Sequence, residues 1–161
     1  MKIGIIVYSQ TGNTYETARR LKERLEKDSR IVKLEQVTSI GKTPANIAAI
    51  KFDNLPKVEP YDLIVFAAPV QAFTLALVMK AYLEQIQSLQ GKKVACFVTK
   101  RLASKWTGGN NAVNTMAKIC AAKGASIIGR GIVVWAGRKR QQSIATCLDS
   151  LTNIISKTPR A

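Results

Sequence analysis

Short apolar runs alternate along this chain with stretches in which apolar residues recur about every 3.6 positions, and this alternation restricts the fold more than any other feature. The runs are continuous, so each expected strand is buried on both faces of a sheet. The expected strands are residues 2–8, 31–34, 63–68, 94–98 and 126–135. The expected helices are residues 13–27, 75–89, 110 or 111 to 123, and 138–156, with a short helix at 44–50 inside an irregular stretch.

Buried strands that alternate with helices form a parallel sheet with helices on both of its faces. The pattern therefore predicts an α/β fold, a three-layer doubly wound sandwich with a five-stranded parallel sheet. A chain of 161 residues without a long linker suits one domain, residues 1–161. In such sheets a ligand binds beyond the carboxyl ends of the strands.

Local signals mark where the elements end. Pro69 is expected to stop the third strand, and Gly91 to cap the end of the second helix. Asn110 or Asn111 is expected to cap the start of the third helix, which Gly124 closes.

The composition excludes several kinds of chemistry. The chain has no histidine, so catalysis by a histidine-containing triad or an imidazole base is ruled out. Cys96, Cys120 and Cys147 are far apart and form no CxxC motif, which predicts buried thiols and no metal site. No apolar run is long enough to span a bilayer, and the N-terminal run is too short for a signal peptide, so a cytoplasmic location is expected.

The net charge of +15 is unevenly distributed. Residues 1–90 carry 12 basic and 9 acidic side chains, whereas residues 91–161 carry 13 basic side chains and one acid, Asp149. This asymmetry predicts an anionic ligand or a partner with an acidic docking surface. The basic run Arg138–Arg140 opposes the dipole of the helix it begins, so it is interpreted as a docking patch or as a solvated face. Nucleic acid is not favoured, because no nucleic-acid-binding motif accompanies the charge.

A polar loop joins the first expected strand directly to the first helix. It consists of Ser9, Gln10, Thr11, Gly12, Asn13 and Thr14. Unpaired N–H groups and the dipole at a helix N-terminus favour an anion, and a glycine lets the backbone close around it. Neither the lysine of a nucleoside triphosphate loop nor the glycine spacing of a dinucleotide loop is present. The alternative is that these residues only cap the helix.

The string Ser-x-Thr-Gly-Asn-Thr, directly after an N-terminal strand, closely resembles the FMN phosphate loop of the flavodoxin family. The order and spacing of the elements are similar to that family over essentially the whole chain. The resemblance implies a flavodoxin-like, short-chain fold with strand order 2-1-3-4-5, and FMN as the cofactor. It implies that the phosphate is held by Ser9, Gln10, Thr11, Gly12, Asn13 and Thr14.

The resemblance also assigns two flavin-flanking loops. After the third strand it implies that the ring lies beside Pro69, Val70, Gln71, Ala72 and Phe73. Phe73 is the candidate aromatic contact, with core packing as the alternative. After the fourth strand the resemblance implies a loop formed by residues 99–109, with cofactor contacts from Thr99, Lys100, Trp106, Gly108 and Gly109. Trp106 either stacks on the flavin or lies on the surface.

The loop after the fourth strand departs from the family, because it lacks the usual tyrosine and acidic residues. It carries three cations instead, Lys100, Arg101 and Lys105. Cations beside the flavin favour its anionic reduced form. We therefore expect a less negative potential for full reduction than an acidic flavodoxin has.

The favoured function is an FMN-binding electron-transfer protein that carries electrons between partner proteins and has no catalytic residues of its own. One alternative is an FMN-dependent NAD(P)H oxidoreductase acting on quinones or similar acceptors. A second is a flavin-free binding module of the same fold. A monomer is favoured over an oligomer, since oligomers are typical of the oxidoreductases.

Overall fold

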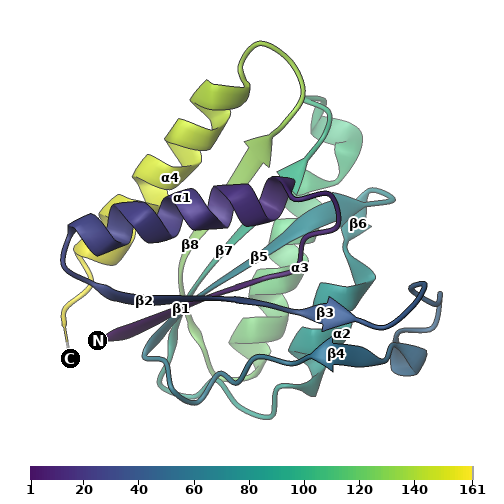
Figure 1. The fold of residues 1–161 in the computed structure, drawn as a ribbon, viewed down its shortest axis with the longest axis horizontal. Coiled ribbons are helices and arrows are strands. Elements are labelled where there is room, and N and C mark those ends of the chain that lie inside the picture. The colour runs from purple at the N-terminus through teal and green to yellow at the C-terminus, as the bar shows by residue number, and fades with distance from the viewer. Residues whose placement is uncertain (161) are drawn as a thin grey trace.

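A parallel sheet forms the middle layer of the molecule (Figure 1). The structure is a computed structural model that describes residues 1–160, without the side chain of Lys105. The strands of this layer are β1 (Lys2–Val7), β2 (Ile31–Gln36), β5 (Leu63–Gln71), β7 (Lys93–Lys100) and β8 (Ser126–Val134). They lie in the order β2-β1-β5-β7-β8 and pair in parallel. The predicted doubly wound fold and its strand order are confirmed.

Helices cover both faces of the sheet (Figure 1). The helices are α1 (Asn13–Lys27), α2 (Leu77–Gln85), α3 (Gly109–Ala122) and α4 (Arg140–Ser156). Because successive strand residues point to opposite faces, Ile5 of β1 packs under α1 and α4, whereas Ile6 packs under α2 and α3. Both side chains are fully buried, as the continuous apolar runs predict.

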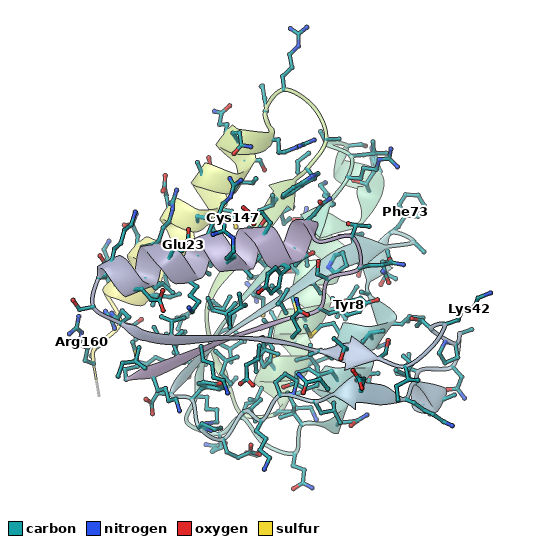
Figure 2. All side chains as sticks on the ribbon, in the orientation of Figure 1. Tyr8, Glu23, Lys42, Phe73, Cys147 and Arg160 are labelled. Carbon is teal, nitrogen blue, oxygen red and sulfur yellow. The ribbon has the colours of Figure 1, made fainter. Side chains whose placement is uncertain are left out.

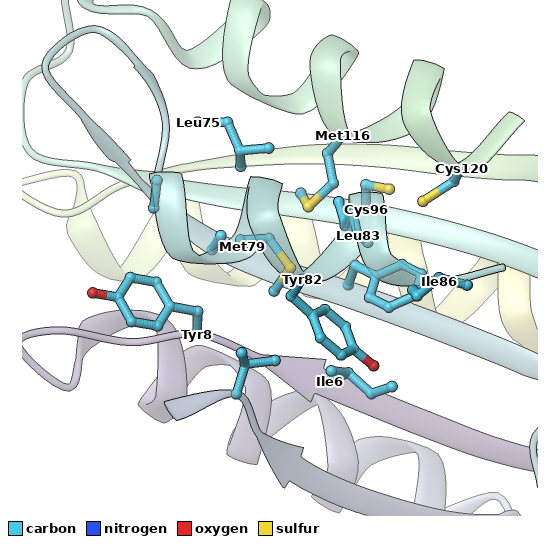
Figure 3. Close-up of a cluster of buried hydrophobic side chains, with 14 of the residues drawn as sticks. Ile6, Tyr8, Leu75, Met79, Tyr82, Leu83, Ile86, Cys96, Met116 and Cys120 are labelled. Carbon is cyan, nitrogen blue, oxygen red and sulfur yellow. The ribbon is translucent and has the colours of Figure 1, made fainter. Parts of the chain in front are cut away.

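The core under α2 and α3 combines aliphatic, aromatic and sulfur-containing side chains (Figure 3). The ring of Tyr82 meets Phe66 edge to face with centroids 6.3 Å apart, and its hydroxyl donates to the carbonyl of Pro56 at 2.7 Å. Burial raises the pKa of Tyr82 above its ordinary value. All three cysteines are buried and unbridged, as predicted.

Short elements extend the sheet or lie beside it. β3 (Thr38–Ser39) and β4 (Phe52–Asn54) form an antiparallel pair, and β6 (Thr74–Leu75) folds back on the end of β5 as a hairpin. Two 3-10 turns occupy Ile47–Ala49 and Lys105–Thr107. Within residues 1–160, no helix has the length and apolarity needed to cross a membrane.

Two predicted ends of elements are wrong around β5 and α2. Pro69 does not stop β5, which continues to Gln71. The amide of Tyr8 donates to the carbonyl of Ala67, so the backbone groups of Ala67 face β1. Strand residues alternate, so the backbone of Pro69 faces the same side. Because β1 has already ended at that level, the missing N–H of Pro69 breaks no hydrogen bond of the sheet. Gly91 does not cap α2, which ends at Gln85, because Leu89 is buried in an extended loop that bonds to Lys123.

The start of α3 also differs from the prediction. Gly108 occupies the cap position with φ of +85°, and Asn110 and Asn111 both lie inside the helix. The end of α3 is as expected, since the amide of Gly124 donates to the carbonyl of Ala121 just beyond the last turn.

The contact between Gly4 and Tyr61 gives a test of the core. A Cβ on Gly4 would lie 2.6 Å from the Tyr61 ring, which is almost fully buried. Gly4→Ala is therefore expected to lower the free energy of unfolding by about 1–3 kcal/mol, measured by urea denaturation. In a Tyr61→Ala background the same substitution should cost much less, because the ring is gone. An equal cost in both backgrounds would contradict this packing.

Candidate functional site

The loop between β1 and α1 is organised by the hydroxyl of Ser9. Its Oγ accepts hydrogen bonds from the amides of Gly12 at 3.1 Å and Tyr15 at 3.3 Å. Gly12 has φ of +92°, a conformation that other residues rarely adopt, and lies just before the first turn of α1. Ser9 thus shapes the loop through its oxygen, while its own proton remains able to donate.

Other amides of this loop have no acceptor within residues 1–160. These are the backbone N–H groups of Gln10, Thr11, Asn13 and Thr14. Residues 10–12 are exposed, and the positive end of the 15-residue helix α1 lies beside them. Unpaired amides at a helix N-terminus bind phosphate-like anions. The residues present therefore fit a phosphate group.

The side chain of Thr14, one of the predicted phosphate ligands, makes a hydrogen bond inside the protein. It is buried, and its hydroxyl lies 2.6 Å from the hydroxyl of Thr99 at the end of β7. This hydrogen bond joins the first loop to the third across the carboxyl edge of the sheet. The backbone amide of Thr14 has no acceptor within residues 1–160.

The second loop is the hairpin between β5 and β6. Ala72 and Phe73 form its turn with φ of +47° and +62°, values that are strained for residues other than glycine. Phe73 is 66% exposed and projects away from the body of the molecule, so it does not pack in the core (Figure 2). The side-chain amide of Gln71 donates to Gln10 at 2.6 Å, which ties this loop to the first.

The third loop is held from inside by Lys100. Its ammonium donates to the carbonyl of Ser104 at 3.0 Å and to the hydroxyl of Thr107 at 3.2 Å. Gly108 lies so close to the hairpin that a Cβ would come within 2.0 Å of the carbonyl oxygen of Phe73. Trp106 is 90% exposed, and the side chain of Lys105 lies outside the described residues.

A cavity of about 500 Å³ opens where these loops meet. Eight of the predicted site residues line it: Gln10, Thr11, Asn13, Pro69, Val70, Gln71, Thr99 and Lys100. The other predicted residues lie nearby in the three loops without lining it: Ser9, Gly12, Thr14, Ala72, Phe73, Trp106, Gly108 and Gly109. The cavity thus joins the acceptor-free amides of the first loop to the ends of β5 and β7.

The remaining lining residues include four that the sequence did not assign to the site: Trp135, Ala136, Gly137 and Arg140. Arg101, one of the three cations noted in the third loop, also lines the cavity. Arg140 lies over the indole ring of Trp135, 5.2 Å from its centroid, and its Nε donates to the Trp135 carbonyl. The available signal was the basic run at the start of α4, which opposes the helix dipole and so has no local stabilising role.

Glu16, Arg19 and Arg20 form ion pairs on the first turns of α1, beside the loop. Glu16 accepts hydrogen bonds from Arg19 and from Arg20, each at 2.9 Å. These bonds, with that from Arg19 the strongest, lower the pKa of Glu16 from 4.5 to about 2. The same partner raises the pKa of Arg19. The two arginines therefore neutralise the acid nearest the anion-binding amides.

The fold and the loop define a doubly wound α/β protein whose first strand-to-helix turn has the acceptor-free amides that suit an anion. The family profile described as the flavodoxin domain matches residues 4–126, which is most of the chain. The chain belongs to the flavodoxin domain family. A search of curated protein sequences found no match.

Solved flavodoxin structures share this fold. Flavodoxin 2 from Bacillus cereus is 19% identical with a TM-score of 0.70, and the alignment covers 98% of this chain and 100% of that one. A flavoprotein from Lactobacillus acidophilus, solved in complex with FMN, is 21% identical with a TM-score of 0.62, covering 91% and 97%. A flavodoxin variant from Fusobacterium nucleatum, bound to flavin mononucleotide, is 16% identical with a TM-score of 0.66, covering 98% and 97%.

The lowered pKa of Glu16 predicts a pH-dependent contribution to stability. A carboxylate whose pKa is depressed by folding stabilises the protein above its unfolded pKa, and this contribution disappears as the pH falls through 4.5 toward 2. Because the pair is exposed to solvent, Glu16→Gln should cost less than about 1 kcal/mol near neutral pH. Urea unfolding should show the two proteins converging below about pH 2.

The matched control is Glu84→Gln, at an exposed carboxylate that forms no ion pair within the described residues. The difference in unfolding free energy between Glu84→Gln and the wild type should not change over the same pH range. A Glu16→Gln difference that persists unchanged in acid would contradict the ion-pair assignment.

Proposed function

We propose that this protein binds FMN and carries electrons between partner proteins. The observation that carries the proposal is the set of acceptor-free amides in the loop before α1, which face a cavity at the carboxyl edge of the sheet. The family assignment and the FMN-bound neighbours support FMN as the cofactor. Bound FMN would supply the electron-transfer chemistry, and the protein would set its potential and access.

The residues divide into two proposed roles. The first loop would hold the phosphate through Ser9, Gln10, Thr11, Gly12, Asn13 and Thr14, with Thr14 acting through its amide. The other two loops would flank the ring through Pro69, Val70, Gln71, Ala72, Phe73, Thr99, Lys100, Trp106, Gly108 and Gly109. Both aromatic side chains of these loops are exposed, so each is able to turn toward a ring at the cavity mouth.

The positive charge of the cavity supports a raised reduction potential for bound flavin. Lys100, Arg101 and Arg140 line it, and no acidic residue does so among those that the structure describes. Positive charge near the ring stabilises the anionic reduced flavin relative to the oxidised form. We therefore propose that full reduction occurs at a less negative potential than in an acidic flavodoxin.

A carrier fits this lining better than an enzyme with its own acid–base chemistry. The cavity contains amide, hydroxyl, indole and cationic side chains, and the sequence has no histidine. Exposed Arg101, Arg138 and Lys139 stand near its rim and suit the docking of an acidic redox partner.

The first test is an absorbance titration of the purified protein with FMN, followed by anaerobic addition of NADPH. We expect saturable one-to-one binding with a shifted flavin band that NADPH alone does not reduce. Rapid bleaching by NADPH would instead assign the protein as an oxidoreductase. Absence of FMN binding would overturn the proposed function and leave the flavin-free alternative.

Arg140 allows the phosphate contribution to be separated from that of the ring. If its charge acts on the phosphate, Arg140→Gln should weaken FMN binding about three- to tenfold and leave riboflavin binding nearly unchanged, because riboflavin lacks the phosphate. The control is Lys157→Gln, an exposed cation beyond the opposite end of α4. Equal losses for both flavins would place Arg140 against the ring or assign it a purely structural role.

The potential provides a separate test of the cationic wall. Arg101→Gln combined with Arg140→Gln should make the potential for full reduction of bound FMN more negative by roughly 20–60 mV, because two positive charges are lost from the cavity, and the field of a charge at the phosphate end also reaches the ring. Spectroelectrochemical titration of both proteins measures this shift, with Lys157→Gln as the reference. A shift toward less negative values would contradict the proposed tuning.

A further inference from the structure

β8 lies at the edge of the sheet and leaves one side of its backbone unpaired. Among the described strands it pairs with β7 alone. The amide of Trp135, just beyond β8, donates to the carbonyl of Lys100 at the end of β7 at 2.8 Å, whereas the amide of Val134 donates to the hydroxyl of Ser143 of α4 at 2.8 Å, on the other side. Since strand residues alternate, the backbone groups of Arg130 and Ile132 also face away from β7. These groups have no acceptor or donor within residues 1–160.

A groove runs along this edge beside α4. Its volume is about 680 Å³, larger than the cavity assigned to the flavin, and its floor includes Gly131, Ile132, Val134 and Cys147. Cys147 is packed so closely against β8 that a Cβ on Gly131 would lie 2.5 Å from its sulfur. Burial raises the pKa of Cys147 to about 12, so this thiol is an apolar part of the floor.

The groove has cations and no acid along it. Arg130, Arg138 and Lys139 are exposed lining residues, and the lining contains no aspartate or glutamate. The one acid of residues 91–161, Asp149 on α4, is paired with Arg24 of α1. An extended segment placed on this edge would therefore meet positive charge at both ends of the groove.

We propose that the edge of β8 binds an extended acidic segment of a partner protein, which adds to the sheet as a further strand. The unpaired backbone groups at Arg130 and Ile132 would provide main-chain hydrogen bonds, and alternate side chains of the segment would enter the groove. The three cations select an acidic sequence. They also disfavour a second copy of this chain, because two copies would place like charges opposite each other on proteins of net charge +15.

The position of this edge gives the binding a role in electron transfer. Ala136 and Gly137 line both the groove and the cavity assigned to the flavin. A partner held along β8 would thus stand beside the cavity mouth. That role depends on the proposed function, whereas strand addition itself does not require a flavin.

The test uses a synthetic peptide of alternating glutamate and valine, added to the full chain with and without FMN. Binding is measured by titration calorimetry, and the contact is located by amide hydrogen exchange. We expect slower exchange at Arg130 and Ile132, and no binding of the matched lysine–valine peptide. Binding of both peptides alike, or protection elsewhere than β8, would overturn the proposal. If FMN fails to bind while peptide binding remains, only the proposed function fails.

Two substitutions at Arg130 separate the contribution of its charge to peptide binding from the contribution of its backbone N–H. Arg130→Gln removes the charge and should weaken binding about threefold. Arg130→Pro also removes the outward N–H without touching the ladder to β7, and should weaken binding roughly fivefold further. Circular dichroism checks that the proline variant is folded. If the proline variant is not folded, two other measurements test the proposal. One is the amide exchange of the wild type at β8. The other is the peptide affinity of the double variant Arg138→Gln, Lys139→Gln, which should fall about tenfold.

The oligomeric state completes the test. Sedimentation of the chain without peptide should show a monomer. A dimer that dissociates when Arg130 is changed to proline would assign the edge to a second copy and overturn the acidic-partner proposal.

Discussion

The pairing of β1 with β2 on one side and β5 on the other determines where the loops of the site lie. It places the loop before α1 at the carboxyl edge beside the end of β5, with the end of β7 one strand further along. In a parallel sheet all strands end at this edge, so loops that are distant in sequence become neighbours. The hydrogen bond between the hydroxyls of Thr14 and Thr99, and the one that Gln71 donates to Gln10, connect these loops through their side chains.

Much of the fold could be predicted because its signals are local. The bounds of α1 follow from its apolar period, and the existence and order of the five parallel strands follow from continuous apolar runs, which burial on two faces requires. The short strands β3, β4 and β6 were missed, because two or three residues carry no period. The predictions from Pro69 and Gly91 were wrong for a common reason. Whether a proline ends a strand or a glycine caps a helix depends on which segment lies beside it, and the tertiary structure decides that.

In the candidate site, too, local features could be predicted and long-range contacts could not. The first loop could be predicted from its own residues, because the proposed anion contact uses the backbone of that loop alone. The closeness of Gly108 to Phe73 and the packing of Arg140 on Trp135 join segments that no local pattern links. The sequence marked the basic start of α4 only as a surface patch, yet Arg140 lines the same cavity as Gln10, Thr11 and Asn13 of the first loop. The family assignment supports a flavoprotein, while the role of each residue stays a prediction.

The hairpin turn at Ala72 and Phe73 has a consequence of its own. Two consecutive residues with positive φ form the kind of tight turn in which asparagine followed by glycine is the most stable pair. An alanine and a phenylalanine there cost on the order of 1–3 kcal/mol each relative to relaxed backbone. The chain therefore gives up stability to hold an apolar ring in water, in the same hairpin that lines the cavity through Val70 and Gln71. A sequence optimised for stability alone would place a different pair at this turn.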